Sequence, residues 1–350
     1  MSGRVARSLM GAVAAVIVLA GCANTQAGTP ASRTAAPAVS SPSPTPTPTS
    51  QAQRIPTTCD ALMPSSLLAE IGAGLTPEDR HTEFATTWAD ERVGALSCRW
   101  SNGAEWPDSL LVQVSVGPEV TRTAFEGFLN GEQGGGTPAP AVASDAYTLA
   151  ASGTPDGFLF LTPHYGVLAG LYPGSSVSLS SDAAMRALEH VHGVVAGLPA
   201  PGPLWVPTPN LRGATDCDSL ATTAQLGEFG GLPAARTMKS DGGEYSTSLF
   251  DIDRQVGGYW CIWGADDATV SGTISVSVLP GGAEYAARAR PAGSTDVAGI
   301  GEAAYVTPKG VLNVVASRGW LQVSGSDGRP SIEQAKALAK QVLVNVGYTG

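Results

Sequence analysis

The chain has 350 residues, of which 43% are hydrophobic and only 14% are charged, and its formal net charge is −10. This length suits two domains of ordinary size, and 43 glycines with 26 prolines indicate many turns and short strands. An acidic chain repels phosphate backbones, and no cluster of Lys and Arg offsets the repulsion here. The composition therefore argues against nucleic-acid binding.

The first 21 residues have the organisation of an export signal. Arg4 and Arg7 form a basic start, and an apolar run occupies residues 9–20. A helix needs about 20 apolar residues to cross a membrane, so this run is too short to span one, but it suits the core of a signal peptide. We therefore expect residues 1–21 to be removed on export.

The signal ends in Leu-Ala-Gly-Cys, which resembles the lipobox of bacterial lipoproteins. The resemblance implies that Cys22 becomes the first mature residue and carries acyl chains such as palmitate. Two or three chains hold a protein on a membrane far better than one. The alternative is an ordinary secretory signal in which Cys22 has no special role. We expect a lipid anchor on the extracytoplasmic face of the cell membrane.

Residues 22–55 have the composition of a disordered tether. Ser or Thr alternates with Pro over residues 41–49, without an apolar period, so this stretch cannot bury a core. Alternating prolines favour an extended chain that rises about 3 Å per residue. The tether can therefore hold the folded part up to about 100 Å from the membrane.

The rest of the chain contains one pattern twice: a Cys-Asp pair followed by Cys-x-Trp. The pattern occupies Cys59-Asp60 and Cys98-Arg99-Trp100, and then Cys217-Asp218 and Cys261-Ile262-Trp263. Other echoes, such as Asp-Ala-Tyr at 145–147 and Ala-Ala-Tyr at 303–305, keep the same order. We interpret residues 56–198 and 211–350 as two copies of one unit, joined by a Pro-rich linker over 199–210.

Both copies are predicted to hold the same elements in the same order. A short helix follows the first Cys, and the second Cys shares one face of a strand with the Trp, because strand side chains alternate. A half-buried strand, a helix, a pair of strands and a long helix follow. The predicted ranges are 65–71, 110–116, 121–129, 157–161, 166–172 and 182–196, and then 219–226, 274–278, 283–289, 311–316, 320–324 and a last helix capped by Ser331 and Gln334. These elements predict an α+β fold, with an antiparallel sheet backed by helices in each domain.

The five cysteines suit one lipid site and two disulfides. An exported chain is in an oxidising compartment, and its four remaining cysteines allow three connectivities. The duplication favours Cys59–Cys98 and Cys217–Cys261, each closing a loop of about 40 residues and contributing roughly 4 kcal/mol. Metal binding is the alternative, but the sequence has no Cys-x-x-Cys.

These features together resemble a group of actinobacterial envelope lipoproteins. The group combines a lipobox, a Pro/Thr tether, a Cys…Cys-x-Trp domain and a Gly-x-Gly-Glu/Asp-Ala-Ala segment, which residues 299–304 match here. The match covers 210–350 well and 56–200 more loosely, where only Ser-Asp-Ala-Tyr at 144–147 corresponds to that segment. In layout the group is similar to the sensor domains of actinobacterial receptor serine/threonine kinases. The resemblance implies neither catalytic residues nor a cofactor.

Few residues form a pattern that points to chemistry. Gly299 and Gly301 follow no clear parallel strand and open no helix, so we interpret them as a turn and not as a dinucleotide loop. His190 and His192 are two apart on a predicted helix, so they point in different directions and make a poor metal pair. His81 and His164 have no ligand-like neighbours in sequence. The acid pairs 251/253 and 266/267 lack the spaced oxygens of a calcium loop.

The sequence lacks the common signatures of serine hydrolases. Neither Gly-x-Ser-x-Gly nor Ser-x-x-Lys occurs, although a triad assembled from distant residues stays open. We expect Trp100 and Trp263 to pack on the disulfides. The candidates for surface recognition, with core burial as the alternative for each, are Trp88, Trp106, Trp205 and Trp260.

We predict a lipid-anchored binding or sensor-like lipoprotein that is not an enzyme and needs no metal or cofactor. The expected partners are the membrane, through Cys22, and an envelope lipid, glycan or protein. A deep, partly apolar pocket would favour a small ligand. A broad apolar patch would favour the first alternative, a scaffolding lipoprotein. A His beside an acid and a nucleophile in a cleft would favour the second, an envelope hydrolase.

Overall fold

The computed structural model describes residues 50–130, 136–149, 157–240, 249–265 and 272–350, which belong to one compact unit, Thr47–Gly350. The predicted signal, Cys22 and the Ser/Thr-Pro tract up to residue 49 lie outside the described residues. Among the described residues, no helix combines the length and apolar character needed to span a membrane.

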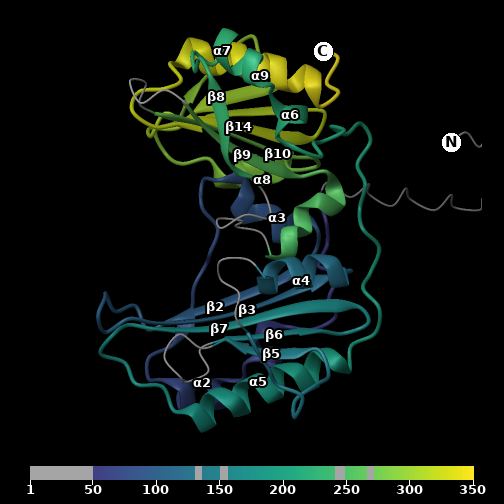
Figure 1. Ribbon diagram of the computed structural model, residues 1–350, viewed down its shortest axis with the longest axis vertical. Coiled ribbons are helices and arrows are strands. Elements are labelled where there is room, and N and C mark those ends of the chain that lie inside the picture. The colour runs from purple at the N-terminus through teal and green to yellow at the C-terminus, as the bar shows by residue number, and fades with distance from the viewer. Residues whose placement is uncertain (1–49, 131–135, 150–156, 241–248, 266–271) are drawn as a thin grey trace, which may run out of the picture. The chain divides into compact units, whose positions relative to one another are not determined.

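Each copy forms a seven-stranded antiparallel sheet within the described residues (Figure 1). Sheet A, in the first copy, has the order β1-β2-β3-β7-β6-β5-β4. Its strands are β1 (Thr76–Pro77), β2 (Leu96–Ser101), β3 (Leu110–Pro118), β4 (Thr137–Pro138), β5 (Ala146–Leu149), β6 (Gly157–Leu161) and β7 (Tyr165–Pro173).

Sheet B, in the second copy, repeats this order strand by strand. From its other edge it runs β8-β9-β10-β14-β13-β12-β11. Its strands are β8 (Ala235–Ser240), β9 (Tyr259–Ala265), β10 (Thr273–Leu279), β11 (Thr295–Asp296), β12 (Ala303–Val306), β13 (Leu312–Ala316) and β14 (Gly319–Gly325). The predicted α+β class and the two similar domains are therefore confirmed.

The helices also correspond between the copies. The first copy contains α1 (Cys59–Leu62), α2 (Ser65–Ile71), the 3-10 helix η1 (Ala85–Trp88), α3 (Ala89–Arg92), α4 (Arg122–Asn130) and α5 (Ser181–Ala196). The second contains α6 (Cys217–Leu220), α7 (Thr223–Glu228), the 3-10 helix η2 (Leu249–Val256), α8 (Ala283–Ala289) and α9 (Ile332–Asn345). One helix was predicted over 219–226, but Ala221 is extended and Thr222 caps a new helix, so two short helices occupy this range. The predicted capping box of Ser331 and Gln334 is present.

One face of each sheet, here called the core face, packs against the long helix of its copy, α5 or α9 (Figure 1). Trp100 and Trp263 lie in these two cores, as predicted. The disulfide Cys59–Cys98 joins α1 to β2, and Cys217–Cys261 joins α6 to β9. Both predicted bridges are therefore present, and each fastens the first helix of its copy to the core strand that carries the Trp.

The opposite face of each sheet, here called the second face, receives a segment from the other copy. The first crossing segment, residues 78–95, connects β1 to β2, and its η1 packs on β10, β14 and α8. The equivalent β8–β9 connection contains η2, which packs on β3 and α4. The two copies therefore exchange equivalent segments, as the subunits of a two-fold symmetric dimer do.

Packed structure starts before the predicted end of the tether at Ile55. Gln51, Arg54 and Ile55 are buried, and the backbone N–H of Arg54 donates to the carbonyl of Gly94 at 2.9 Å. The Arg54 guanidinium donates to the carbonyl of Gly202 at 2.7 Å, within the predicted linker. These residues of the predicted tether therefore take part in packed structure, through buried contacts with segments distant in sequence.

Candidate functional site

The junction between the copies is centred on a buried apolar cluster. Ala85, Trp88 and Ala89 of the first crossing segment pack with residues of the second copy, which are Leu279, Tyr285, Ala286 and Trp320. Trp88 is only 5% exposed, so it is not the surface contact that the sequence suggested. Nothing near Trp88 in sequence indicates this burial, because the covering surface belongs to the other copy.

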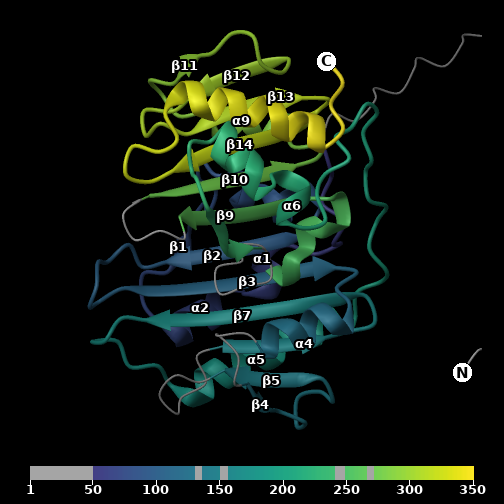
Figure 2. The same cartoon turned by 45° about the horizontal axis from the view of Figure 1, so that its top comes forward.

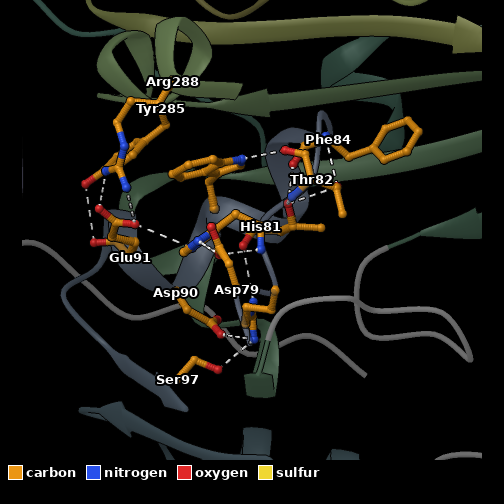
Figure 3. A network of polar contacts seen from close by, with 12 residues as sticks. Asp79, His81, Thr82, Phe84, Asp90, Glu91, Ser97, Tyr285 and Arg288 are labelled. Carbon is orange, nitrogen blue, oxygen red and sulfur yellow. Dashed lines mark hydrogen bonds and ion pairs between the residues drawn. The ribbon is translucent and has the colours of Figure 1, made fainter. Parts of the chain in front are cut away.

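His81 lies beside this cluster with a carboxylate at each ring nitrogen (Figure 3). Its Nδ1 is 2.7 Å from Asp79 Oδ1, and its Nε2 is 3.4 Å from Glu91 Oε2. The ring stacks on Trp88, with 4.0 Å between centroids. The backbone N–H of His81 also donates to Asp79 Oδ1, and this bond, more than the ring's own contacts, lowers the pKa of the Asp79 carboxyl.

Glu91 connects this group to the second copy. Its carboxylate accepts from two nitrogens of Arg288 on α8, Nη1 and Nη2, the latter at 3.3 Å. The Arg288 guanidinium lies 4.6 Å from the Trp88 ring centroid, and its bond to Glu91 raises the pKa of Arg288. Beside it, burial raises the pKa of Tyr285 to about 12. Figure 3 shows Glu91 between His81 and Arg288, so one carboxylate serves both copies.

Two further arginines fasten the ends of the first crossing segment. Arg80 Nη1 lies 2.8 Å from Asp90 Oδ2 and donates to Ser97 Oγ of sheet A at 2.8 Å. Arg92 donates to the carbonyl of Pro280 in the second copy at 2.6 Å. Burial lowers the pKa of Arg92 to about 10. The segment is thus tied to sheet A and to the second copy by charged side chains that are themselves largely buried.

The part of the segment around the start of η1 covers a row of polar side chains on the second face of sheet B. This row, here called the polar strip, consists of Ser275, Ser277, Gln322 and Ser324. Gln322 Oε1 accepts from the backbone N–H of Ala85 at 2.6 Å, and its Nε2 donates to the carbonyl of Glu83 at 2.7 Å. The space left between the strip, Trp260 and the segment is about 20 Å³, which is room for one water. The deep pocket expected for a small ligand is not found at this place.

The other three histidines make separate contacts within the first copy. His190 Nε2 lies 3.0 Å from the carbonyl of Ala61, whereas His192 packs edge-on against Phe160, so the two rings diverge as predicted. His164 packs edge-on against the neighbouring Tyr165. Within the described ranges, no three His, Cys, Asp or Glu side chains gather as a metal site would require.

The remaining sequence candidates are placed only in part. Asp253 is buried, while the side chain of Asp251 and the pair Asp266 and Asp267 lie outside what the structure describes. The predicted turn at 299–301 has both glycines at positive φ and leads into the strand β12 and not into a helix. Trp205 and Trp260 are half-buried. Of the four surface candidates, only Trp106 is largely exposed.

Trp106 belongs to a corner of sheet A that presents two exposed aromatic side chains. Trp106 is 70% exposed and Tyr172 is 48% exposed. Figure 2 shows the β2–β3 loop, which carries Trp106, at the same end of the strands as the C-terminal end of β7, which carries Tyr172. We call this pair the aromatic corner. The sequence indicated Trp106 but gave no reason to choose Tyr172.

Hydrogen bonds hold the aromatic corner in place. Asn102 Oδ1 accepts from the backbone N–H of Leu110 at 2.9 Å, and Asn102 Nδ2 donates to the carbonyl of Asp108 at 2.9 Å. The N–H of Ser176 donates to the carbonyl of Pro107 at 3.1 Å and so joins this loop to the segment after β7. The loop is preorganised, and both of its exposed acids, Glu105 and Asp108, flank the tryptophan.

Comparison of this chain with protein-family models, with curated proteins and with solved structures found no match.

Proposed function

We propose that this chain is an exported lipoprotein, anchored through Cys22, that binds a macromolecular partner in the cell envelope and is not an enzyme. The order of signal, Leu-Ala-Gly-Cys and tether in the sequence supports the anchor. Two disulfides in the folded part are typical of an oxidising, extracytoplasmic compartment. On this proposal the two copies act as a platform at the end of the tether.

The aromatic corner is the observation that carries the binding function. Binding energy at protein surfaces concentrates in a few residues, and Trp and Tyr are enriched among them. Trp106 is exposed but stands on a loop whose backbone is already fixed, so little conformational freedom is lost on binding. Neighbouring acids favour a partner surface that carries positive charge at the rim of the contact.

The geometry of the junction favours a function in binding a large partner over binding of an enclosed small ligand or catalysis of a reaction. The polar strip leaves space for about one water. Both ring nitrogens of His81 face carboxylates, and the bonds that the Thr82 and Thr87 hydroxyls make are to each other and to backbone groups. A hydrolase needs a nucleophile hydrogen-bonded to its base, and this arrangement does not provide one.

In-cell crosslinking tests the proposal. A photoreactive residue replaces Trp106 in one strain. In a control strain it replaces Val344 on α9, which is 63% exposed and so is similarly accessible. We expect a discrete adduct from position 106 only. The captured protein or polymer is then identified and its binding to the purified chain is measured. Trp106→Ala should weaken that binding about 30-fold, which is typical of a hot spot. Adducts from position 344 but none from 106 would refute the assigned surface.

A further inference from the structure

A row of polar side chains on the second face of sheet A lies beside Tyr172 of the aromatic corner. Gly170 of β7 pairs with Gln113 of β3, and Gln113 pairs with Arg99 of β2. The backbone N–H of Glu78, just after β1, donates to the carbonyl of Arg99 at 2.9 Å. Positions paired across neighbouring strands lie side by side on one face. Because neighbouring strands are about 4.8 Å apart, the row from β7 to β1 is about 14 Å long.

Gly170 gives Tyr172 room to lie along its strand. A Cβ at position 170 would be only 2.4 Å from Tyr172 Oη and 2.6 Å from its Cε2, so the phenol end of the ring occupies the space of the missing side chain. This places the phenol end across from Gln113, the partner of Gly170 on β3. Since Tyr172 is also 48% exposed, it presents an aromatic surface to solvent in line with the polar row.

The polar members of the row are positioned by each other and still have hydrogen-bonding groups to offer. Arg99 Nε donates to Glu78 Oε2 at 2.9 Å, and Gln113 Nε2 donates to Ser115 Oγ at 3.2 Å. Within the part of the chain that the structure describes, Gln113 Oε1 and the two terminal nitrogens of Arg99 have no hydrogen-bond partner. A partner can therefore use an amide acceptor, guanidinium donors and a carboxylate, all in one row.

We propose that Tyr172 and this row bind a glycan chain whose sugars carry no acidic group. A sugar ring presents C–H groups of partial positive charge, and the face of an aromatic ring is negative, so the two pack together. Sugar hydroxyls both donate and accept, which suits the groups of the row. The nearby acids Glu105 and Asp108 repel polymers that carry phosphate or uronic acid. The inference rests on the proposed function, because Tyr172 belongs to the aromatic corner, and it names the class of the partner.

The second copy lacks this arrangement. When β2 and β9 are aligned by their Cys-x-Trp pattern, Gly170, Gln113 and Arg99 correspond to Ser324, Ser275 and Ile262. The isoleucine has no hydrogen-bonding group, and Ser324 has a side chain where the first copy leaves room for the ring. Residue 326, which corresponds to Tyr172, is a serine. Sheet B therefore provides control positions for the experiment.

Affinity electrophoresis tests this proposal on the chain from Ala23 onward, exported so that the disulfides form. Native gels contain dissolved mannan, galactan, dextran or glycol chitin, which are uncharged, or polygalacturonate, which is anionic. We expect at least one uncharged polymer to retard the chain and polygalacturonate to have no such effect. Tyr172→Ala should weaken the binding about tenfold, and Gln113→Ala about fivefold. Tyr172→Phe, which keeps the ring, should stay within about threefold of the unchanged chain, and Ser324→Ala in sheet B should bind like it.

Three results would overturn the inference: no retardation by any uncharged polymer, equal retardation by polygalacturonate, or retardation that Tyr172→Ala leaves unchanged. If Tyr172→Ala fails to fold, Gln113→Ala decides the last point. The adduct captured at position 106 separates this failure from failure of the proposed function. A captured protein would refute the glycan but leave the binding function in place, whereas capture from position 344 alone would refute the surface itself.

Discussion

The two copies can be compared position by position, because their strand registers align. When Cys98 is aligned with Cys261, Trp100 aligns with Trp263 and Val114 aligns with Val276, so the residues of the core faces correspond. On the second faces, Leu168 of sheet A falls on Gln322 of sheet B, and Leu159 falls on Asn313. The core faces agree, and the second faces differ in polarity.

The immediate neighbours of these positions also differ in polarity. In sheet A, Leu159 is buried against Phe125 of α4, so an apolar side chain suits this position. In sheet B, Gln322 meets the backbone of the first crossing segment and donates also to Asn313 Oδ1 at 2.7 Å. Buried polar groups need hydrogen-bond partners. An irregular segment leaves backbone N–H and C=O groups that need partners on the sheet, whereas an α-helix pairs most of its own backbone groups. The comparison shows that each side chain matches its own neighbours, which are apolar at Leu159 and hydrogen-bonding at Gln322.

The largest effect we expect tests the equivalence of the two cores. Removing Cys59–Cys98 by double alanine substitution, or Cys217–Cys261 in the same way, should each lower the free energy of unfolding by roughly 4 kcal/mol, because each bridge closes a similar loop. Denaturant titration of the exported chain from Ala23 onward measures both. If one variant lost much of its free energy of unfolding and the other lost none, only one of the two copies would depend on its disulfide for stability.

A smaller effect should separate the second faces. Gln322→Leu gives sheet B the residue of sheet A and leaves the N–H of Ala85 and the carbonyl of Glu83 without this partner, at a cost of about 2–3 kcal/mol. Leu168→Met in sheet A, a swap of similar volume, should cost less than about 1.5 kcal/mol. Unfolding by urea measures both changes. Equal losses would mean that the polar contact has no special part in the junction.

The smallest effect concerns alkaline pH and the second copy. Burial raises the pKa of Tyr285 and of Tyr305 to about 12, whereas tyrosines in the unfolded chain ionise near pH 10. Their stabilising contribution is therefore complete below pH 10 and is lost as the pH rises toward 12, by on the order of 1–2 kcal/mol each. Buried Arg92, with a pKa of about 10, titrates over the same range with the opposite sign. The measurement is therefore the difference between Tyr305→Phe and the unchanged chain in thermal unfolding at pH 9, 10 and 11, and Tyr305→Phe should lose less stability as the pH rises.

The features predicted from sequence are those that depend on neighbours in the chain or on the repeat. Alternating burial in β2, the cap at Ser331 and the pairing of the cysteines within each copy belong to this group. The junction could not be predicted, because its bonds join distant residues: Ala85 and Gln322 are 237 positions apart. Trp88 illustrates the limit, since only the fold reveals which surface buries it. Tyr172 does so in reverse, because strand periodicity did not show that its side chain is 48% exposed.

Arg54 has a mechanical consequence if the chain is held on the membrane through Cys22 as proposed. Any tension that passes along the tether reaches the packed structure near this residue. Its side chain contacts Glu119 at 2.8 Å and bonds the carbonyl of Gly202 and the side chain of Gln255, so it touches both copies and the segment that joins them. A pull is therefore shared among several elements at once, and no single edge strand has to bear the load and peel away from its sheet.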